Sequence, residues 1–358
     1  MKKASHSFLY RYVIPFTEAV TVKGKRLVER EGIILALKNP EKNLTGYGEI
    51  APLPGLHKEC LQSAEAQLVE VLSKRELASV DLLPEKLFPS VRTGLEMALI
   101  NLEAAESGKS PVFANSNHAA HHVPVNALLF GDTAQIMQRA EEYFSLGYRT
   151  FKLKISVDNA ESAIKSVVEL LRRFGKNIEL RLDANQSFSL DDAIGFAQQI
   201  PQGSIAYIEE PLQNAEEIGE FHAKTAIRSA LDETLWLKPE LIDLIPAASI
   251  SALILKPNRL GGISAALKLA RYARKNNLQA VFSSAFESGI SLSFYSWLAA
   301  SASSEPAACG LDTYRYLKHD LLDTPFGAEN GLLDASRLYR EGQSVNERRL
   351  RLTSLWTL

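Results

Sequence analysis

From about residue 119 to residue 324, short apolar runs alternate with longer segments in which apolar residues recur at helical spacing. The runs predict eight strands: Val123–Leu129, Thr150–Ile155, Ile178–Asp183, Ala206–Glu209, Ile227–Asp232, Ser251–Lys256, Gln279–Ser283 and Ala307–Leu311. The segments between them predict helices over Thr133–Leu146, Asn159–Phe174, Leu190–Gln199, Ala215–Lys224 and Ser264–Lys275. Repeats of roughly 23–30 residues are typical of strand–helix units in a parallel α/β barrel. Seven or eight such units favour a closed barrel over an open sheet.

Residues 1–118 lack this rhythm and predict a separate, small α+β domain. Alternating apolar and polar residues predict strands at Ser7–Pro15 and Glu31–Leu37. Between them, Thr17–Arg30 is polar and contains Gly24 among lysines, which predicts a mobile loop.

The rest of this first domain is predicted from glycines and helical spacing. Gly46-Tyr47-Gly48-Glu49 predicts a turn, and helices are expected at Lys58–Leu72 and Val91–Glu106. A linker near residues 107–122 would lead into the barrel, and residues 325–358 would return to complete the first domain.

Composition narrows the class of protein. The 358 residues are 46% hydrophobic and 23% charged with a net charge of −2, so nothing favours nucleic acid or a membrane surface as a partner. Cys60 and Cys309 lie far apart in sequence and predict neither a disulfide framework nor a zinc site. We expect a cytoplasmic protein, because no segment resembles a signal peptide or a membrane span. The oligomeric state stays open.

Charged residues stand where the predicted barrel strands end. Their order is base, three acids, base, given by Lys152 with Lys154, then Asp183, Glu209 and Asp232, then Lys256. The carboxyl ends of barrel strands form the active-site mouth, so these side chains should converge. Three carboxylates there would make an oxygen-rich site for a hard cation such as Mg²⁺. A metal that holds a substrate carboxylate, flanked by amines, is suited to removing the neighbouring proton.

Each of these residues also has a plainer explanation. Lys152 and Lys154 share one face of a strand, where crowded ammonium groups favour loss of a proton and a role as general base; they could equally be solvated residues of an amphipathic strand. The acids could be helix caps, but three in successive units favour a shared site. Of the Glu209-Glu210 pair, we favour Glu209 as the ligand, and we expect Glu210 and Glu233 to pair with nearby cations.

Weaker candidates surround this row. Asn185 could orient a ligand, and Arg259 could perturb the pKa of Lys256 or bind a substrate carboxylate. After the seventh predicted strand, a run of small polar residues could bind an anionic group of the substrate; its candidates are Ser284, Glu287 and Ser288. Two further features carry little weight. Gly261-Gly262-Ile263-Ser264 could offer amides at a helix start, and His118, His121 and His122 are expected in a solvated loop, not a metal site.

At these motifs the chain resembles the enolase superfamily, in its muconate-lactonizing branch. The resemblance covers nearly the whole chain and rests on Phe151-Lys152-Leu153-Lys154, Leu182-Asp183-Ala184-Asn185, Ile208-Glu209-Glu210-Pro211, Leu231-Asp232-Glu233 and Leu255-Lys256-Pro257. It implies an α/β fold: a modified (β/α)₇β TIM barrel over residues 119–324, with an N-terminal α+β capping domain over residues 1–118 and a closing loop at Thr17–Arg30.

Within that branch the chain is most similar to the o-succinylbenzoate synthase family of menaquinone biosynthesis. The pointers are Ser283–Ile290 and Gly310-Leu311-Asp312-Thr313. The resemblance implies Mg²⁺-dependent syn dehydration of a cyclohexadiene carboxylate through an enediolate, with Mn²⁺ able to substitute. Lys154 would be the base and then the acid, and Lys256 would stabilise the intermediate. Lys152 would tune the basicity of Lys154 and contact the substrate carboxylate.

Other activities stay open at this point. N-succinylamino acid racemases resemble the synthases closely, and either that activity or a dual enzyme would use both Lys154 and Lys256. Dipeptide epimerases tend to carry Asp-x-Asp at the eighth strand, where this chain has Asp312-Thr313-Tyr314, so that activity is disfavoured, as is muconate cycloisomerase. A non-catalytic barrel is disfavoured because all three acids and all three lysines are present.

Overall fold

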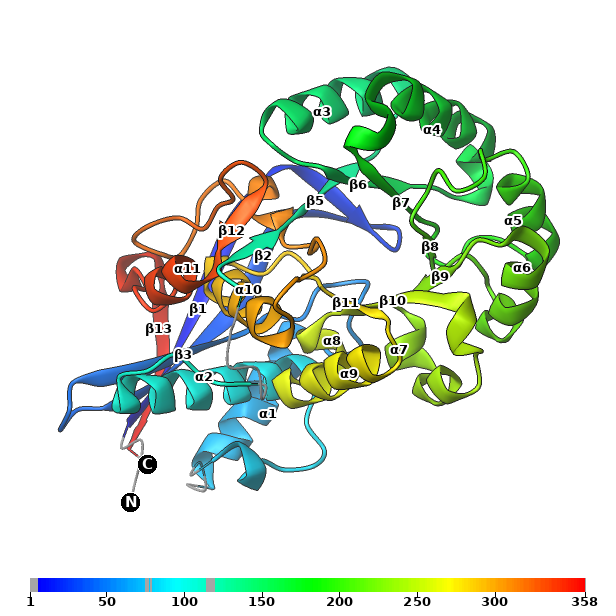
Figure 1. Ribbon diagram of the computed structural model, residues 1–358. Coiled ribbons are helices and arrows are strands. Elements are labelled where there is room, and N and C mark those ends of the chain that lie inside the picture. The colour runs from blue at the N-terminus through cyan, green and yellow to red at the C-terminus, as the bar shows by residue number, and fades with distance from the viewer. Residues whose placement is uncertain (1–5, 75–76, 78, 114–119, 358) are drawn as a thin grey trace.

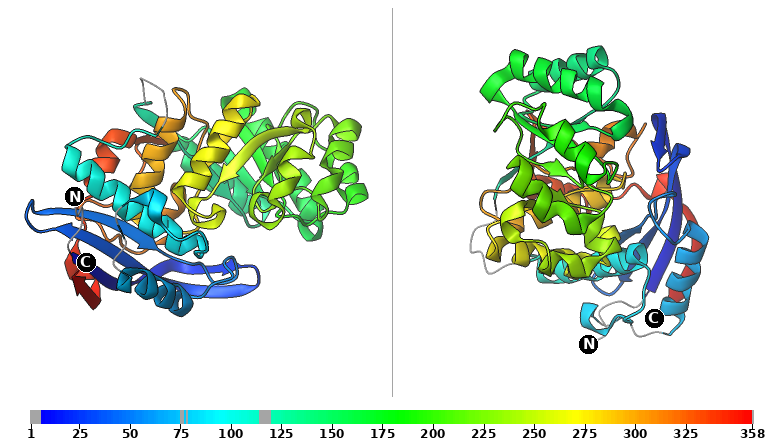
Figure 2. Two further views of the ribbon diagram at one scale, coloured as in Figure 1. Left: turned by 90° about the horizontal axis from the view of Figure 1, so that it is seen from below. Right: turned by 90° about the vertical axis from the view of Figure 1, so that its right-hand side faces the viewer.

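An antiparallel sheet and a parallel barrel make up the fold, with one long helix between them (Figure 1). The computed structural model describes residues 6–74, 77, 79–113 and 120–357. In the left view of Figure 2, the sheet lies on one side of the helix α2 (Pro89–Ser107) and the yellow barrel helices lie on the other. Helix α2 contacts both parts, packing on β3 of the sheet and on α8 and α9 of the barrel.

Seven parallel strands form the barrel wall in the order β11-β10-β9-β8-β7-β6-β5. They are β5 (Asn126–Leu129), β6 (Thr150–Lys154), β7 (Glu179–Asp183), β8 (Ile208–Glu209), β9 (Ser229–Leu231), β10 (Ile250–Leu255) and β11 (Gln279–Phe282). The helices between them are α3 (Thr133–Ser145), α4 (Ala160–Phe174), α5 (Leu190–Ala197), α6 (Ile218–Thr225), α7 (Thr234–Leu237), α8 (Pro257–Leu260) and α9 (Ile263–Lys275). The barrel predicted from the sequence is confirmed, with each predicted strand or helix overlapping its observed counterpart up to β11.

The eighth barrel position is filled by a short bridge and not by a regular strand. Cys309 pairs in parallel with Val125, and Gly310 pairs in parallel with Ser283. Backbone hydrogen bonds reinforce both contacts, including one of 3.0 Å from the Asn126 amide to the Cys309 carbonyl. The segment therefore joins the two edges of the seven-stranded sheet and closes the ring.

The second sheet has four antiparallel strands in the order β13-β1-β2-β3. They are β1 (His6–Val22), β2 (Lys25–Asn39), β3 (Leu44–Ile50) and β13 (Arg351–Thr357). The loop predicted at Thr17–Arg30 is wrong, because this segment continues β1 and β2 as a hairpin with Val20 opposite Leu27. Lys23 and Gly24 both have positive φ and form the tight turn that the long hairpin requires.

The turn predicted at Gly46-Tyr47-Gly48-Glu49 is also wrong, because these residues lie in β3. Their glycines allow β3 and α2 to approach each other closely. A Cβ on Gly46 would lie 2.7 Å from the Leu102 Cβ, and a Cβ on Gly48 would lie 2.9 Å from the Ala98 nitrogen. Only glycine fits at these two positions, so the motif marks sheet–helix packing.

The remaining helices are α1 (Leu61–Ser73) of the sheet domain, the barrel helix α10 (Gly289–Ala302), which follows β11, and α11 (Ala335–Glu341) of the C-terminal segment. Two short strands, β4 (His122–Pro124) and β12 (Leu332–Asp334), pair with each other. Strand β13 pairs with β1, so the end of the chain lies in the N-terminal sheet (Figure 1). The predicted domain boundary at residues 118 and 119, like His118, lies outside the described residues. His121 and His122 are exposed.

Candidate active site

Two lysines of β6 face the acids of the next strands. Lys152 Nζ lies 2.8 Å from Asp183 Oδ2 and 2.7 Å from Glu209 Oε1. Lys154 Nζ lies 2.6 Å from the same Asp183 oxygen and 2.6 Å from Asn185 Oδ1. The alternation of a strand puts both ammonium groups on one face, and the parallel register sets Lys154 level with Asp183.

The three acids end β7, β8 and the turn after β9, and all are buried. Asp183, Glu209 and Asp232 are at most 1% exposed. Lys256 follows β10 and pairs with Asp232 Oδ2, so each end of the acid row is held by a lysine. Glu209 Oε2 and Asp232 Oδ1 have no hydrogen-bond partner among the residues that the structure describes. The lysines and the acids therefore converge in space, as the sequence predicts.

Burial and charge act against each other in this row. Burial raises the pKa of Glu209 to about 8, helped by the neighbouring Asp183, and burial raises the pKa of Asp232 to about 6. Burial opposes ionisation of Asp183 too, but Lys152 and Lys154 outweigh it and hold its pKa well below the usual range. Burial also works against a charged Lys152, yet the carboxylates around it raise its pKa well above normal. The expectation that crowding would strip a proton does not hold for Lys152.

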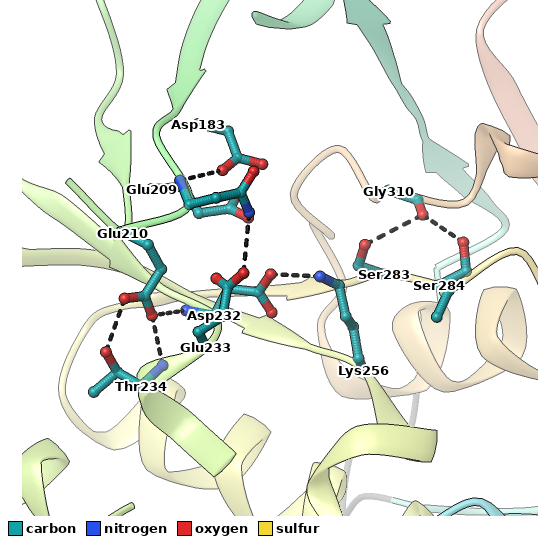
Figure 3. A network of polar contacts seen from close by, with 12 residues as sticks. Asp183, Glu209, Glu210, Asp232, Glu233, Thr234, Lys256, Ser283, Ser284 and Gly310 are labelled. Atoms are coloured by element: carbon teal, nitrogen blue, oxygen red, sulfur yellow. Dashed lines mark hydrogen bonds and ion pairs between the residues drawn. The ribbon is translucent and has the colours of Figure 1, made fainter. Parts of the chain in front are cut away.

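Glu210 has a different task from Glu209. Its carboxylate accepts hydrogen bonds from the Asp232 amide at 2.6 Å, from the Thr234 amide and hydroxyl at 2.8 Å each, and from Gln186 Nε2 at 2.8 Å. Figure 3 shows Glu210 turned toward Thr234 while Asp232 faces Lys256. No cation pairs with Glu210 within the described ranges, contrary to the sequence prediction. Glu210 instead fixes the turn that presents Asp232.

Asn185 and Glu233 connect the site to the sheet domain. Asn185 accepts from Lys154 and donates from Nδ2 to Glu233 Oε1 at 3.0 Å. Glu233 lies 3.6 Å from Nζ of Lys23, which stands at the tip of the β1–β2 hairpin. The hairpin thus reaches across the barrel mouth to the edge of the acid row.

A cavity of about 640 Å³ opens over this row. Three sides enclose it: the hairpin residues Glu18–Lys23, the strand-end lysines, and the Ser283–Phe286 segment after β11. Ser284 lines the cavity, and its hydroxyl donates to the Gly310 carbonyl at 3.0 Å (Figure 3). The same hydroxyl lies 2.8 Å from the Thr313 hydroxyl.

Three predicted substrate-binding residues are not brought to the cavity surface. Arg259 is buried with its guanidinium 4.8 Å from the Trp236 ring centre. Glu287 is 1% exposed and accepts from the Ala285 amide and from Asn258. Ser288 is fully buried and begins α10. Glu287 accepts from backbone and Ser288 caps α10, whereas Arg259 packs on Trp236, so none of the three lines the cavity.

Sequence reasoning also missed several residues of the cavity wall. They are Leu53, Leu56, Asn126, Leu128, Phe130 and Tyr316. Phe130 directly follows β5, so the strand-end rule used for the other units could have found it, whereas Asn126 begins that strand. Glu18–Lys23 also line the cavity, and they lie in the segment Thr17–Arg30 that the family resemblance implied as a closing loop, here as a paired hairpin.

The acid row does not form a closed metal cage as it stands. In the parts of the chain that the structure describes, no three His, Cys, Asp or Glu side chains converge tightly enough to hold a metal ion alone. The ammonium of Lys152 lies between Asp183 and Glu209.

Within the part of the chain that the structure describes, no helix is both long and apolar enough to cross a membrane.

Comparison with known families matches both parts of the fold. Residues 135–346 match the family described as "Enolase C-terminal domain-like". Residues 2–102 match "MenC, N-terminal domain". The two matches fall on the barrel with its following segments and on the sheet domain with α2.

Two curated relatives match over most of this chain. An o-succinylbenzoate synthase from Pectobacterium atrosepticum is 31% identical over 302 residues, which cover 81% of this chain and 86% of that protein. The Protein PHYLLO, chloroplastic, of Arabidopsis thaliana is 32% identical over 375 residues and 89% of this chain. The chain spans only 22% of the length of that plant protein.

Solved structures share the fold at low sequence identity. An enolase superfamily member from Roseovarius nubinhibens, complexed with magnesium, has a TM-score of 0.82 at 17% identity and 99% coverage of both chains. An N-succinyl Arg/Lys racemase from Bacillus cereus has a TM-score of 0.81 at 18% identity and full coverage of both chains. At such identities the likeness shows the fold alone.

Proposed function

Since the chain belongs to the enolase superfamily and, within it, to the o-succinylbenzoate synthase family, we propose that it forms o-succinylbenzoate for menaquinone biosynthesis. The reaction is the syn elimination of water from 2-succinyl-6-hydroxy-2,4-cyclohexadiene-1-carboxylate. The observation that carries the proposal is the match to an o-succinylbenzoate synthase over most of the chain, and the structure supplies the chemistry: Lys154 and Lys256 both line the cavity and are held by different acids of one buried row.

Lys154 is the proposed base. It takes the proton from the ring carbon that bears the carboxylate, and the electron pair of the broken C–H bond moves toward that carboxylate. Asn185 and Asp183 fix the Nζ of Lys154, so the amine needs little reorganisation to reach the ring.

The same ammonium then protonates the departing hydroxyl. The C–O bond breaks, water leaves, and the electron pair returns to form the aromatic ring. Because Lys154 both removes the proton and protonates the hydroxyl, the departing hydrogen and hydroxyl must lie on the same face of the ring, as in a syn elimination. Lys256, paired with Asp232, stays protonated and stabilises the negative charge between the two steps.

The acid row fits Mg²⁺ by its donor chemistry. Asp183, Glu209 and Asp232 offer hard oxygen ligands, and two of their buried oxygens, Glu209 Oε2 and Asp232 Oδ1, are unpaired within the described residues. Bound there, Mg²⁺ or Mn²⁺ supplies positive charge that stabilises the substrate carboxylate as its negative charge grows. Lys152 lies between two of these ligands, Asp183 and Glu209, and would remain beside a bound ion as a fixed positive charge.

The cavity walls suit the rest of the substrate. The hairpin residues Glu18–Lys23 and the Ser283–Phe286 segment enclose the space beyond the lysines. We assign this space to the succinyl tail. Ser284 and Thr313 offer hydroxyls there, and exclusion of bulk water strengthens the electrostatic contacts at the ring.

A second candidate is racemisation of N-succinylamino acids, alone or beside the synthase activity. It is favoured by one observation: two lysines line the cavity, and racemisation needs one acid–base group on each face of the carbon. Epimerisation of dipeptides is less well supported. Asp312 lines the cavity, but its Oδ1 already accepts from Tyr148 and from Arg315 at 3.1 Å, and Tyr314 stands where the epimerases tend to carry a second aspartate for the substrate amine.

A side-by-side assay with Mg²⁺, using a chelator as control, tests the proposal. One arm follows dehydration of the cyclohexadiene substrate, and the other follows α-deuterium exchange in N-succinylamino acids. Fast chelator-sensitive dehydration with little exchange is the expected result. Dominant exchange would make the protein a racemase, and no dehydration at all would overturn the proposed function.

A further inference from the structure

Two helices of the barrel begin against carboxylates from the sheet domain. Glu49 of β3 accepts hydrogen bonds at the start of α10, from the Ser288 amide at 3.0 Å, the Ser288 hydroxyl at 2.8 Å and the Ser291 amide at 3.3 Å. The Tyr12 hydroxyl donates to the same carboxylate. Glu49 is 2% exposed, so its charge is held by these donors and not by solvent.

Glu96 makes the corresponding contact at α9. It lies on α2, is 1% exposed, and accepts from the Ser264 amide at 2.9 Å. A Cβ on Gly262 would lie 2.6 Å from Glu96 Oε2, so glycine is needed for the acid to approach. The amides predicted at Gly261–Ser264 are therefore used by the protein's own carboxylate.

The two contacts differ in what they hold. Helix α10 follows the Ser283–Phe286 segment, which lines the cavity. The backbone from Pro257 to Ser264, where α8 ends and α9 begins, does not line it within the described residues. Glu49 therefore binds the backbone at Ser288, two residues after the cavity-lining Phe286. Glu96 joins the two domains at Ser264, in backbone that does not line the cavity.

We propose that Glu49 is a positioning residue that holds the Ser283–Ser288 segment in its cavity-lining conformation and so links docking of the sheet domain to substrate affinity. The inference rests on the proposed function for its kinetic part only. A second contact from the sheet domain points the same way: Nε of the buried Arg30, on β2, donates to the Phe286 carbonyl at 3.0 Å. The segment is thus held from the sheet domain at both Phe286 and Ser288.

Hydrogen–deuterium exchange of the whole chain tests the structural part without any activity. Glu49→Gln keeps the size of the side chain but removes the charge that the Ser288 and Ser291 amides contact. Exchange in peptides covering residues 283–292 should rise about tenfold, the equivalent of 1.4 kcal/mol, with no change at residues 259–268. Glu96→Gln is the matched control and should give the reverse pattern.

Kinetics then test the link to the substrate. Glu49→Gln should raise KM for the cyclohexadiene substrate about fivefold with kcat within about twofold of wild type, because the wall and not the lysine pair is loosened. Glu96→Gln should leave KM unchanged. Equal KM values in the two variants, or unchanged exchange at residues 283–292 in Glu49→Gln, would overturn the inference.

The design separates this inference from the proposed function. A wild-type protein without dehydration activity would refute the function, and the crossed exchange pattern would still decide whether Glu49 holds the segment. If Glu49→Gln does not fold, Ser288→Ala loosens the same contact from the barrel side. It should reproduce the faster exchange at residues 283–292, and normal exchange there would count against the role of Glu49.

Discussion

Replacing Gly48 by alanine tests the packing that places Glu49. A Cβ at Gly48 would come closest to the carbonyl oxygen of Gly94, and it would lie 2.9 Å from both the Gly94 carbonyl carbon and the Ala98 nitrogen, all backbone atoms of α2. Carbon atoms pack at about 3.5–4.0 Å, so β3 and α2 would have to separate by about 0.6 Å or more. No side-chain rotation relieves this contact, because none of these atoms belongs to a side chain.

The expected cost follows from that geometry. Overpacking a rigid interior costs about 1–3 kcal/mol, and we expect the upper end because three helix backbone atoms are met at once. Gly195→Ala is the matched control, since Gly195 is exposed in α5 with nothing within 4 Å of an added Cβ. It should instead stabilise the protein by about 0.5–1 kcal/mol through better helix propensity.

Urea unfolding of wild type and both variants, followed by circular dichroism, measures the difference. Gly48→Ala should lower the free energy of unfolding by about 3 kcal/mol while Gly195→Ala raises it. Because β3 carries Glu49, Gly48→Ala should also raise KM. A Gly48→Ala protein as stable as wild type would refute the close approach of β3 and α2.

Three further outcomes are expected. Asp232→Asn should raise the Mg²⁺ concentration for half-maximal dehydration more than about tenfold, and an unchanged requirement would exclude Asp232 as a ligand. Asn185→Leu should slow dehydration about tenfold with little change in KM, because Lys154 loses an acceptor that orients it; an unaltered kcat would contradict that role. Burial raises the pKa of Glu287 to about 7, so its contribution to stability is full below its ordinary value of 4.5 and is lost as pH rises through about 7. Glu287→Gln should remove up to about 3 kcal/mol of the fall in unfolding free energy between pH 4.5 and 8, as seen in urea unfolding at both pH values, and identical pH slopes would count against it.

The barrel and its charged strand ends were predictable because both follow local rules. A strand buried on both faces is a continuous apolar run, and the first polar residue after it marks the mouth of the barrel. Lys154, Asp183 and Lys256 could be read in this way, and the structure brings them to one cavity. Their roles in catalysis stay predictions.

The features that were predicted wrongly or not at all have physical causes that do not appear in the periodicity of the sequence. Helix α10 was not predicted, because it is apolar on nearly every side and buried throughout, so it lacks an amphipathic period. The hairpin at Thr17–Arg30 reads as a loop, because its polar residues reach over the barrel mouth instead of covering a core. Glu287 and Ser288 carry suitable chemistry, but they point into the protein at the start of α10 and not into the cavity.

The central claim is that Lys154 is the base for dehydration, and one comparison tests it most directly. Steady-state dehydration by wild type and Lys154→Ala should be measured with Mg²⁺, together with o-succinylbenzoate binding by both proteins. We predict a loss in kcat of about 10³-fold or more in the variant, with product affinity within about tenfold of wild type. A Lys154→Ala protein that binds the product and still turns over within tenfold of wild type would contradict the claim.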